Sequence, residues 1–337
     1  EHLGYAVPES FGLKNFKNTA DIEINILRWW QHRIFRNSGV SADGTEIYLD
    51  TDWLTSLQST AYSDRITWIE NAYEFIDQPG EWYLNRSESK LYYKPDGSMD
   101  GKSATLPVTE QLLVFEGTEN ITFDGVKFED TSWLTPNEIG YNDAQSGTYA
   151  QHNGVWGDVP GAIETHAAKN ITITNSELRN LGIGGIRIGN GSSDCAITNS
   201  AIHDISSSGI FIGNNTGHNH GYCDPGTDVT GVVVRNNYIT RTGLDIFGSS
   251  AICALYTSDT VIDHNEVCYT TYTGISLGWG WDWKNAPCSG NNTVSNNYIH
   301  DTGKTIHDGG SFYSLGLQEG TKVFGNYLHH HSDGLYD

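Results

Sequence analysis

The sequence predicts an all-β protein, a right-handed parallel β-helix (a solenoid) with a small β subdomain inserted at its N-terminal side. Three observations lead to this prediction: a short motif that repeats, apolar and polar residues that alternate within it, and many turn-forming residues. The 337 residues include 38 Gly and a single Met, a composition that suits strands and turns better than helices. A chain of this length can bury a sizeable core.

The repeated motif contains a β-branched pair, one or two Asn, an aliphatic residue, a polar turn, and then Gly with a second apolar strand. It starts at Asn120 and returns at Asn170, Cys195, Val232, Val261, Thr293 and Lys322. One of its positions forms a column of turn residues: Asn175, Asn199, Asn236, His264, Asn296 and Gly325. Successive members of this column are 24, 37, 28, 32 and 29 residues apart. Such a period, with insertions, indicates stacked units that share one apolar core.

The alternation within the motif excludes helical repeats, and the Leu spacing is too sparse for a leucine-rich repeat. A propeller is the weaker alternative, because its blades usually run about 40 to 45 residues. We therefore predict about seven coils of a right-handed parallel β-helix over residues 111–337. Asn in the column of turn residues should adopt a left-handed or bridging conformation, and stacked Asn side chains should hydrogen-bond along the stack.

Residues 1–110 do not repeat and predict a small, mostly β subdomain with one short helix. Residues 82–84 and 90–93 flank a polar turn, which predicts a hairpin. Residues 68–76 predict the short helix, which Pro79 and Gly80 would end.

The composition also restricts the possible partners. A net charge of −22 with only 19 Lys and Arg argues against nucleic acid and anionic membranes, because both need a basic face. The longest apolar runs are far shorter than the roughly 18 residues of a membrane helix. The five Cys form no C-x-x-C pair, which argues against a zinc ribbon, and two disulfides with one free thiol would fit a secreted protein.

An aromatic cluster follows one of the later predicted strands. The sequence Trp279-Gly280-Trp281-Asp282-Trp283 lies in an insertion, and insertions in solenoids often gather on the binding face. Indole rings stack well on sugar rings, so Trp279, Trp281 and Asp282 are predicted to bind a carbohydrate. The alternative is that the indoles cover a loop or cap the end of the solenoid.

Asp308 follows His307 and precedes two Gly, one coil after Asp282 and one coil before Asp333. Parallel coils stack about 4.8 Å apart, so carboxylates one or two coils apart stand roughly 5 to 10 Å from each other. Glycosidases separate their two catalytic carboxyl groups by similar distances, and one of the two keeps its proton while the other stays ionised. However, Asp-Gly-Gly is also an ordinary turn, and any acidic solenoid would offer such pairs.

Arg187 and Tyr313 occupy equivalent positions of two repeats and should face outward from their strands. The same predicted column contains Phe211, Ser276 and Tyr336. Arg187 could bind a hydroxyl or carboxylate of the substrate, with Tyr313 and His307 as further binding residues. The alternative for Arg187 is an exposed side chain on a strand face.

No metal or cofactor is predicted to be required. Residues 329–331 are consecutive His, so their side chains cannot all face one way. His218 and His220 with Cys223 could bind zinc, but they fit an ordinary surface loop better. The sequence has no G-x-S-x-G, H-E-x-x-H or P-loop motif.

Several of these segments resemble secreted right-handed β-helix proteins. Residues 68–84 with 90–93 resemble the β subdomain of that group, and residues 274–281 with 308–316 resemble its later coils. The enzyme family that the chain resembles is glycoside hydrolase family 141, which includes α-L-fucosidase and xylanase activities. The resemblance covers nearly the whole chain, and it implies a β-helix enzyme that hydrolyses glycosidic bonds.

The resemblance carries a catalytic role over to Asp308. In that group the next coil tends to read Gly-Ile-Tyr-x-Asp-Glu-Gly, and Gly334-Leu335-Tyr336-Asp337 begins this phrase. We therefore expect a solenoid that is truncated at its C-terminal side, with a second catalytic carboxylate past Asp337 or replaced by Asp333 or Asp337.

Together, these observations predict a secreted, monomeric glycoside hydrolase that binds a carbohydrate but neither nucleic acid nor membrane. One alternative is a β-helix polysaccharide lyase, which needs cationic groups to neutralise a uronate, and no basic cluster lies near Asp308. The other is a non-catalytic glycan-binding or adhesin module, in which Asp308→Asn would leave glycan affinity intact.

Overall fold

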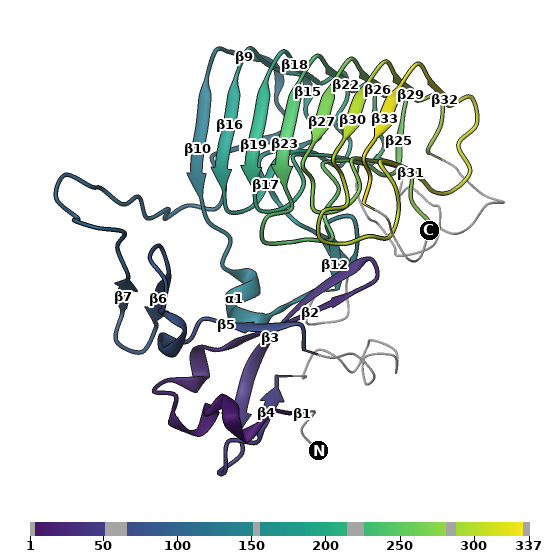
Figure 1. Ribbon diagram of the computed structural model, residues 1–337. Helices are drawn as coiled ribbons and strands as arrows, with labels where there is room; N and C mark the ends of the chain where they lie inside the picture. Colours follow the sequence, from purple (N-terminus) through teal and green to yellow (C-terminus); the bar gives the residue numbers. More distant parts are fainter. Residues whose placement is uncertain (1–3, 51–65, 151–155, 214–225, 281–287, 333–337) are drawn as a thin grey trace.

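The computed structural model describes residues 4–50, 66–150, 156–213, 226–280 and 288–332 (Figure 1). Its larger part is a stack of parallel coils, and a unit of mainly antiparallel strands from the N-terminal part lies beside the stack. The predicted right-handed parallel β-helix is confirmed.

Each coil contributes one strand to each of three parallel sheets, which we number in the order in which the chain visits them. The strands of sheet 1 are β8 (Leu113–Glu116), β14 (Gly161–His166), β17 (Gly184–Ile188), β20 (Ile210–Ile212), β24 (Ile252–Ala254), β28 (Ile275–Leu277) and β31 (Phe312–Ser314). Those of sheet 2 are β9 (Glu119–Asp124), β15 (Lys169–Thr174), β18 (Ala196–Thr198), β22 (Val233–Arg235), β26 (Val261–Asp263), β29 (Thr293–Ser295) and β32 (Lys322–Phe324). Those of sheet 3 are β10 (Lys127–Thr131), β16 (Glu177–Leu181), β19 (Ala201–Ile205), β23 (Tyr238–Thr242), β27 (Glu266–Cys268), β30 (Tyr298–His300) and β33 (Tyr327–His329). A short pair, β21 (Val229–Thr230) with β25 (Thr257–Ser258), lies beside sheet 2.

In each sheet the strands follow the order of the chain, so the described residues form seven coils. The register places like residues on like residues: Ile186 pairs with Ile210, Ile210 with Ile252, and Ile252 with Ile275. These Ile side chains point into the stack and are at most 1 % exposed. Burying one such side chain contributes about 1.5 to 3 kcal/mol, and a coil can do this only against its neighbours.

Between sheets 2 and 3 every coil turns at a residue with a left-handed backbone. The turn residues are Gly125, Asn175, Asn199, Asn236, His264, Asn296 and Gly325, and their φ angles lie between +50° and +71°. Gly and Asn adopt this conformation at the lowest cost. The predicted conformation of the column of turn residues is confirmed.

The residue after each later turn builds a ladder of buried amides. The side-chain amide of Asn237 donates to Oδ1 of Asn265 at 3.0 Å, that of Asn265 to Asn297 at 2.9 Å, and that of Asn297 to Asn326 at 2.9 Å. Each Oδ1 also accepts the backbone N–H of the preceding Asn. The predicted Asn stacking therefore exists mainly one position after the column of turn residues, where the side chains point inward.

The unit beside the stack is an eight-stranded sheet that the N-terminal region and a later insertion build together. Its strands are β1 (Gly4–Ala6), β2 (Glu23–Arg28), β3 (Gln31–Val40), β4 (Glu46–Leu49), β5 (Trp68–Glu70), β11 (Tyr141–Gln145), β12 (Thr148–Ala150) and β13 (Trp156–Asp158). Strand β11 comes from the insertion between the first and second coils, and it pairs with β3 at Tyr141 and Ile34. The insertion thereby ties this unit to the stack.

The remaining elements of this region are short. The hairpin predicted at residues 82–93 is confirmed as β6 (Trp82–Asn85) and β7 (Lys90–Tyr93). The helix predicted at residues 68–76 is wrong, because β5 pairs with β2 and is followed by the 3-10 turn η6 (Tyr73–Phe75). The other 3-10 turns among the described residues of this region are η1 (Glu9–Phe11), η2 (Leu13–Asn15) and η3 (Thr19–Asp21). The α-helix of the described residues, α1 (Thr135–Ile139), lies in the insertion and has Pro136 in its first turn. No described helix is long and apolar enough to cross a membrane.

Three of the five Cys are free thiols, which corrects the expectation of two disulfides. Cys195, Cys253 and Cys268 are buried without a disulfide, whereas Cys288 is disulfide-bonded. Three free thiols among five Cys leave room for one disulfide at most. The free thiols pack as small apolar side chains in and between the strands.

Replacing Asn265 by Ala should interrupt the amide ladder. The change removes the side-chain N–H that donates to the carbonyl oxygen of Val234. It also removes Oδ1, which accepts the backbone and side-chain N–H groups of Asn237, so these buried groups lose their partner. We expect a loss of about 2 to 4 kcal/mol in the free energy of unfolding, measured by urea denaturation. His264→Asn, at the exposed turn position next to it, is the matched control and should change stability little, because Asn tolerates the left-handed backbone. Equal effects of the two substitutions would contradict the structural role of the ladder.

Candidate functional site

The insertion packs against the corner where the chain passes from sheet 3 to sheet 1. We call this region the covered corner, and it comprises Gln145 and Ser146 of the insertion with Phe247, Ser250 and Tyr272 of the coils. The hydroxyl of Ser250 donates to that of Ser146 at 3.0 Å, and the amide of Gln145 donates to the hydroxyl of Tyr272 at 3.1 Å. The N-terminal unit reaches the same corner, where the imidazole of His32 stacks on Phe247 with ring centres 4.8 Å apart.

Asp308 lies at this corner, on the turn that leads into β31. It is 5 % exposed, and its Oδ1 accepts the backbone N–H of Gly309 at 2.8 Å. Gly309 has a φ of +84°, and a Cβ there would lie 2.7 Å from Oγ1 of Thr273, so the turn can approach the preceding coil only with Gly. Burial raises the pKa of Tyr272, and the negative charge of Asp308 adds to this shift. The structure therefore brings Asp308 beside Tyr272 in a region that excludes most water.

A second acid of the covered corner, Asp143, comes from the insertion and was not predicted from the sequence. It is fully buried, and burial raises its pKa to about 8. The backbone N–H of His32 at 3.3 Å, the hydroxyl of Tyr141 at 3.2 Å and the charge of Arg33 oppose this shift only in part. Asp143 is therefore a protonated acid at neutral pH.

Arg187 lies in the predicted outward-facing column, between Glu164 on one side and Phe211 on the other. It is 9 % exposed, and its guanidinium donates to Glu164 at 2.5 Å and to Asp158 of β13 at 2.8 Å. The alternative of an exposed Arg is therefore wrong, because the insertion covers this part of sheet 1. Both ends of the guanidinium already hold a carboxylate, so Arg187 joins the insertion to the stack.

The structure corrects the prediction of an exposed indole at Trp279. Its side chain is 3 % exposed and packs with Phe211, Cys253, Leu255 and Tyr256 on the outer face of sheet 1. An indole in this environment offers no free face to a sugar ring. For Trp279, the packing role that we considered as the alternative fits the structure.

The remaining predicted residues fall into two groups. Tyr313 is half-buried and shares the outward-facing column of Arg187, and His307 is exposed with its Nδ1 2.9 Å from the carbonyl oxygen of Gly303. Four residues lie outside the described part of the chain: Trp281, Asp282, Asp333 and Asp337. The predicted stacking of Asp308 between carboxylates of neighbouring coils therefore stays a prediction.

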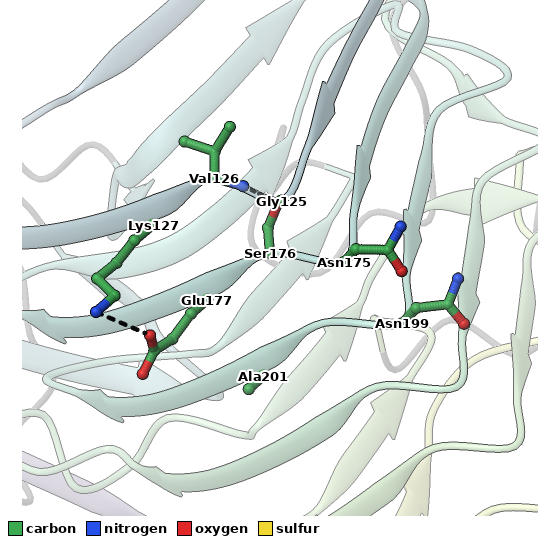
Figure 2. A pocket seen from close by; sticks show the side chains of 8 residues that line it. All are labelled: Gly125, Val126, Lys127, Asn175, Ser176, Glu177, Asn199 and Ala201. Atoms are coloured by element: carbon green, nitrogen blue, oxygen red, sulfur yellow. Dashed lines mark hydrogen bonds and ion pairs between the residues drawn. The ribbon is translucent and has the colours of Figure 1, made fainter.

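A hollow at another corner of the stack, between sheets 2 and 3, contains none of the predicted site residues (Figure 2). It is lined by Gly125, Val126, Lys127, Asn175, Ser176, Glu177, Asn199 and Ala201. Lys127 and Glu177 form an ion pair at 3.4 Å, so the one carboxylate of this lining is already neutralised. The hollow therefore lacks the pair of free carboxyl groups that glycoside hydrolysis needs.

Among the described residues, one group combines ligand types suited to a transition metal. Glu266, Cys268 and His300 place one ligand atom each within 4.8 Å of one another. They lie on the outer face of sheet 3, whereas the covered corner lies where sheet 3 leads into sheet 1.

Comparisons with known proteins agree with the observed architecture. The family model described as "Right handed beta helix region" matches residues 161–336. A solved structure described as a glycoside hydrolase has a TM-score of 0.81 and 24% identity, and the alignment covers 99% of this chain and 65% of that chain. This chain therefore spans about 65% of the length of that protein.

Two further solved structures align less well. An alginate lyase from Paenibacillus sp. str. FPU-7 has a TM-score of 0.36 and 17% identity, over 65% of this chain and 73% of that one. A complex of XylC with xylose has a TM-score of 0.38 and 13% identity, and the alignment covers 76% of this chain and 42% of that chain. No curated protein matches the sequence.

Replacing Arg187 by Met should strongly destabilise the fold. Asp158 and Glu164 would be left largely buried without their shared cation, which costs about 3 to 5 kcal/mol in unfolding experiments. Neutralising both acids as well, with Asp158→Asn and Glu164→Gln, should recover much of this loss. Arg235→Met is the control, because Arg235 is half exposed in its ion pair with Asp263 and should cost about 1 kcal/mol or less. A stable single variant would contradict the joining role of Arg187.

The raised pKa of Asp143 predicts how stability depends on pH. Between about pH 4 and pH 8 the folded protein keeps a proton that the unfolded chain has lost, so stability should fall by about 1.4 kcal/mol per pH unit from this group. Asp143→Asn should flatten the dependence of the unfolding free energy on pH over this range. Asp43→Asn is the control, because hydrogen bonds from Thr45 and Ser41 lower the pKa of Asp43 to about 2 and its effect appears only in more acidic solution. An unchanged slope in Asp143→Asn would contradict the assignment.

Proposed function

The chain belongs to the right-handed β-helix family, and on that premise we propose that it is a glycoside hydrolase in which Asp308 is one of two catalytic carboxyl groups. The likeness of the fold to a solved glycoside hydrolase over 99% of the chain supports the proposal. That glycoside hydrolase is longer than this chain, which covers about 65% of it, so the activity of the full-length relative is carried over here only as a proposal.

The observation that carries the proposal is the position of Asp308 at the covered corner. Its carboxyl group is shielded from bulk water beside Tyr272, and Tyr313 also adds to the raised pKa of Tyr272. General acid catalysis needs a carboxyl group held away from water and within reach of groups that orient a sugar. The exposed His307 and the half-buried Tyr313 would place sugar hydroxyls beside it.

Three other buried acids in and around the insertion, Asp143, Asp158 and Glu164, do not supply the second carboxyl group. Asp143 is fully buried and protonated at neutral pH, so it reaches neither substrate nor water. Asp158 and Glu164 are neutralised by Arg187. We therefore assign the second role to the coil that follows Asp308, with Asp333 and Asp337 as its candidates.

The proposal includes a carbohydrate chain as substrate, with Trp281 and Asp282 as further binding residues. It also includes a monomeric, secreted protein that contacts neither nucleic acid nor membrane. The disulfide at Cys288 supports an oxidising compartment, and the net charge of −22 opposes polyanionic partners.

Two other functions are outcomes of the test rather than proposals. A lyase needs a cation to neutralise a uronate. Lys304 lies on the same turn as Asp308, but it forms an ion pair with Asp301 at 2.8 Å. Arg187 forms ion pairs with Asp158 and Glu164. Both cations are therefore already paired with carboxylates, which disfavours a lyase. A non-catalytic glycan-binding module would bind sugar without releasing any product.

Asp308→Asn should abolish hydrolysis while the protein stays folded. We expect a loss of at least about 100-fold in the release of reducing sugar, the usual scale for a missing acid or base, in a screen of plant and algal polysaccharides and aryl glycosides. Asp259→Asn is the matched control, because Asp259 is exposed and its left-handed backbone suits Asn, so its activity should equal that of the wild type.

Thermal unfolding of both variants would show whether lost activity reflects lost structure. Equal activity in Asp308→Asn and the wild type would reject the catalytic assignment. Product that absorbs in the ultraviolet would indicate a lyase. Sugar binding without any product in the wild type would indicate a glycan-binding module.

A further inference from the structure

The outer face of sheet 3 carries a cluster of three metal-ligand types on neighbouring coils. Strands β27 and β30 pair in parallel, with Cys268 opposite His300 and Glu266 opposite Tyr298. Figure 1 shows β27, β30 and β33 side by side on a face of the stack that the N-terminal unit does not cover. Cys268 is 1 % exposed and His300 is 8 % exposed, whereas 45% of the Glu266 side chain is exposed. The cluster is therefore held by the sheet but open to solvent on the side of Glu266.

The distances within the cluster fit a tetrahedral site. A carboxylate oxygen, the sulfur and an imidazole nitrogen all lie within 4.8 Å of one another. Nε2 of His300 is 3.4 Å from Oε1 of Glu266. Nitrogen and oxygen ligands of tetrahedral zinc, each about 2.1 Å from the ion, are about 3.4 Å apart. Two of the three ligands therefore stand at the required separation.

The imidazole of His300 is also oriented as a metal ligand would be. Its Nδ1 is 2.9 Å from Oδ2 of Asp301, so Nδ1 donates its proton there and Nε2 faces Glu266. Metal-binding His residues commonly donate their second nitrogen to a carboxylate in this way. The ring of Tyr298 stacks on the imidazole with centres 4.2 Å apart and restricts its rotation.

Two earlier coils of the same sheet carry a related arrangement with a different residue in place of Cys268. On the second and third coils, His203 lies 3.2 Å from Glu177 and 2.7 Å from Asp204, in the same arrangement as His300 with Glu266 and Asp301. There the residue opposite His203 is Arg179, whose guanidinium lies 3.8 Å from Glu177.

At the later coils a Cys stands in place of that Arg. In the described part of the chain, Glu266 has His300 as its one ion-pair partner, so no side-chain cation replaces Arg179 beside it. A thiol therefore replaces the guanidinium beside an otherwise similar Glu and His. A metal cation bound by the thiol would supply the positive charge that Arg179 supplies in the earlier coils.

We propose that Glu266, Cys268 and His300 bind one divalent transition-metal ion, preferably Zn²⁺, with water as the fourth ligand. A thiolate and an imidazole favour zinc-like ions, whereas Ca²⁺ and Mg²⁺ prefer sites made only of oxygen. Because its ligands come from two coils, the ion cross-links the fifth and sixth coils. This departs from the sequence-based expectation of no metal, and it is independent of the proposed hydrolysis at Asp308.

The test uses the whole chain after treatment with a chelator. Titration with Co²⁺ should produce the sulfur-to-cobalt charge-transfer absorption with one equivalent of metal, and Zn²⁺ should remove it by displacement. Zn²⁺ should also raise the Tm of the wild type, because it binds only the folded protein. Cys268→Ser and Glu266→Gln should weaken binding at least about 10-fold.

Two variants serve as matched controls. Cys253→Ser removes another buried thiol, and His203→Gln removes the imidazole of the related arrangement, so both should bind Co²⁺ as the wild type does. Cys268→Arg copies the earlier coils, so it should fold, lose the charge-transfer band and show no rise of Tm with Zn²⁺.

The absence of the charge-transfer band in the wild type would overturn the proposal. So would a band that survives in Cys268→Ser, or one that disappears in Cys253→Ser. Weak binding that is equal in all variants would show that the metal associates only non-specifically with the acidic surface, and it would also overturn the proposal.

Discussion

The in-register stacking of the coils is the constraint on which the rest of the structure depends. A single coil cannot hide its own Ile and Val side chains, so each coil must place them on those of its neighbours. Once the inward columns are aligned, the outward columns are aligned as well, because side chains alternate along a strand. The same register that buries Ile186 on Ile210 therefore places Arg187 beside Glu164 and Cys268 beside His300.

The insertion between the first and second coils adds a second constraint. Its strand β11 completes the sheet of the N-terminal unit, and its turn packs on the corner that also carries Asp308. This contact is polar. It is stable because the buried amide and hydroxyl groups form hydrogen bonds with one another, which compensates for their removal from water. The N-terminal unit is thereby fixed beside the proposed catalytic carboxyl, and Asp143 enters the interface as a neutral acid.

The outward columns show how a repeating scaffold varies its chemistry. Burial on sheet 1 is possible for Asp158 and Glu164 because Arg187 lies between them. On sheet 3 the arrangement of Glu, His and Asp occurs twice, once with Arg179 and once with Cys268 beside the Glu. Because the coils superpose, one substitution in a column changes the partner of a carboxylate without changing the backbone around it. Repetition of the coil thus lets an ion pair and the proposed metal site occupy equivalent positions.

The sequence by itself determined the parallel β-helix, its turn residues and the hairpin at residues 82–93, because alternation, left-handed turns and hairpin turns are local properties of the chain. Asp308 was singled out by its place between Asp282 and Asp333 in the repeat and by the family resemblance, and its catalytic role stays a prediction. Only the tertiary structure decided that Trp279 and Arg187 are buried and that Asp143 reaches the covered corner. The length and composition of an insertion do not say which surface it will cover. Register across coils is likewise invisible when the inserted loops differ in length, so the meeting of Cys268 with His300 required the folded chain.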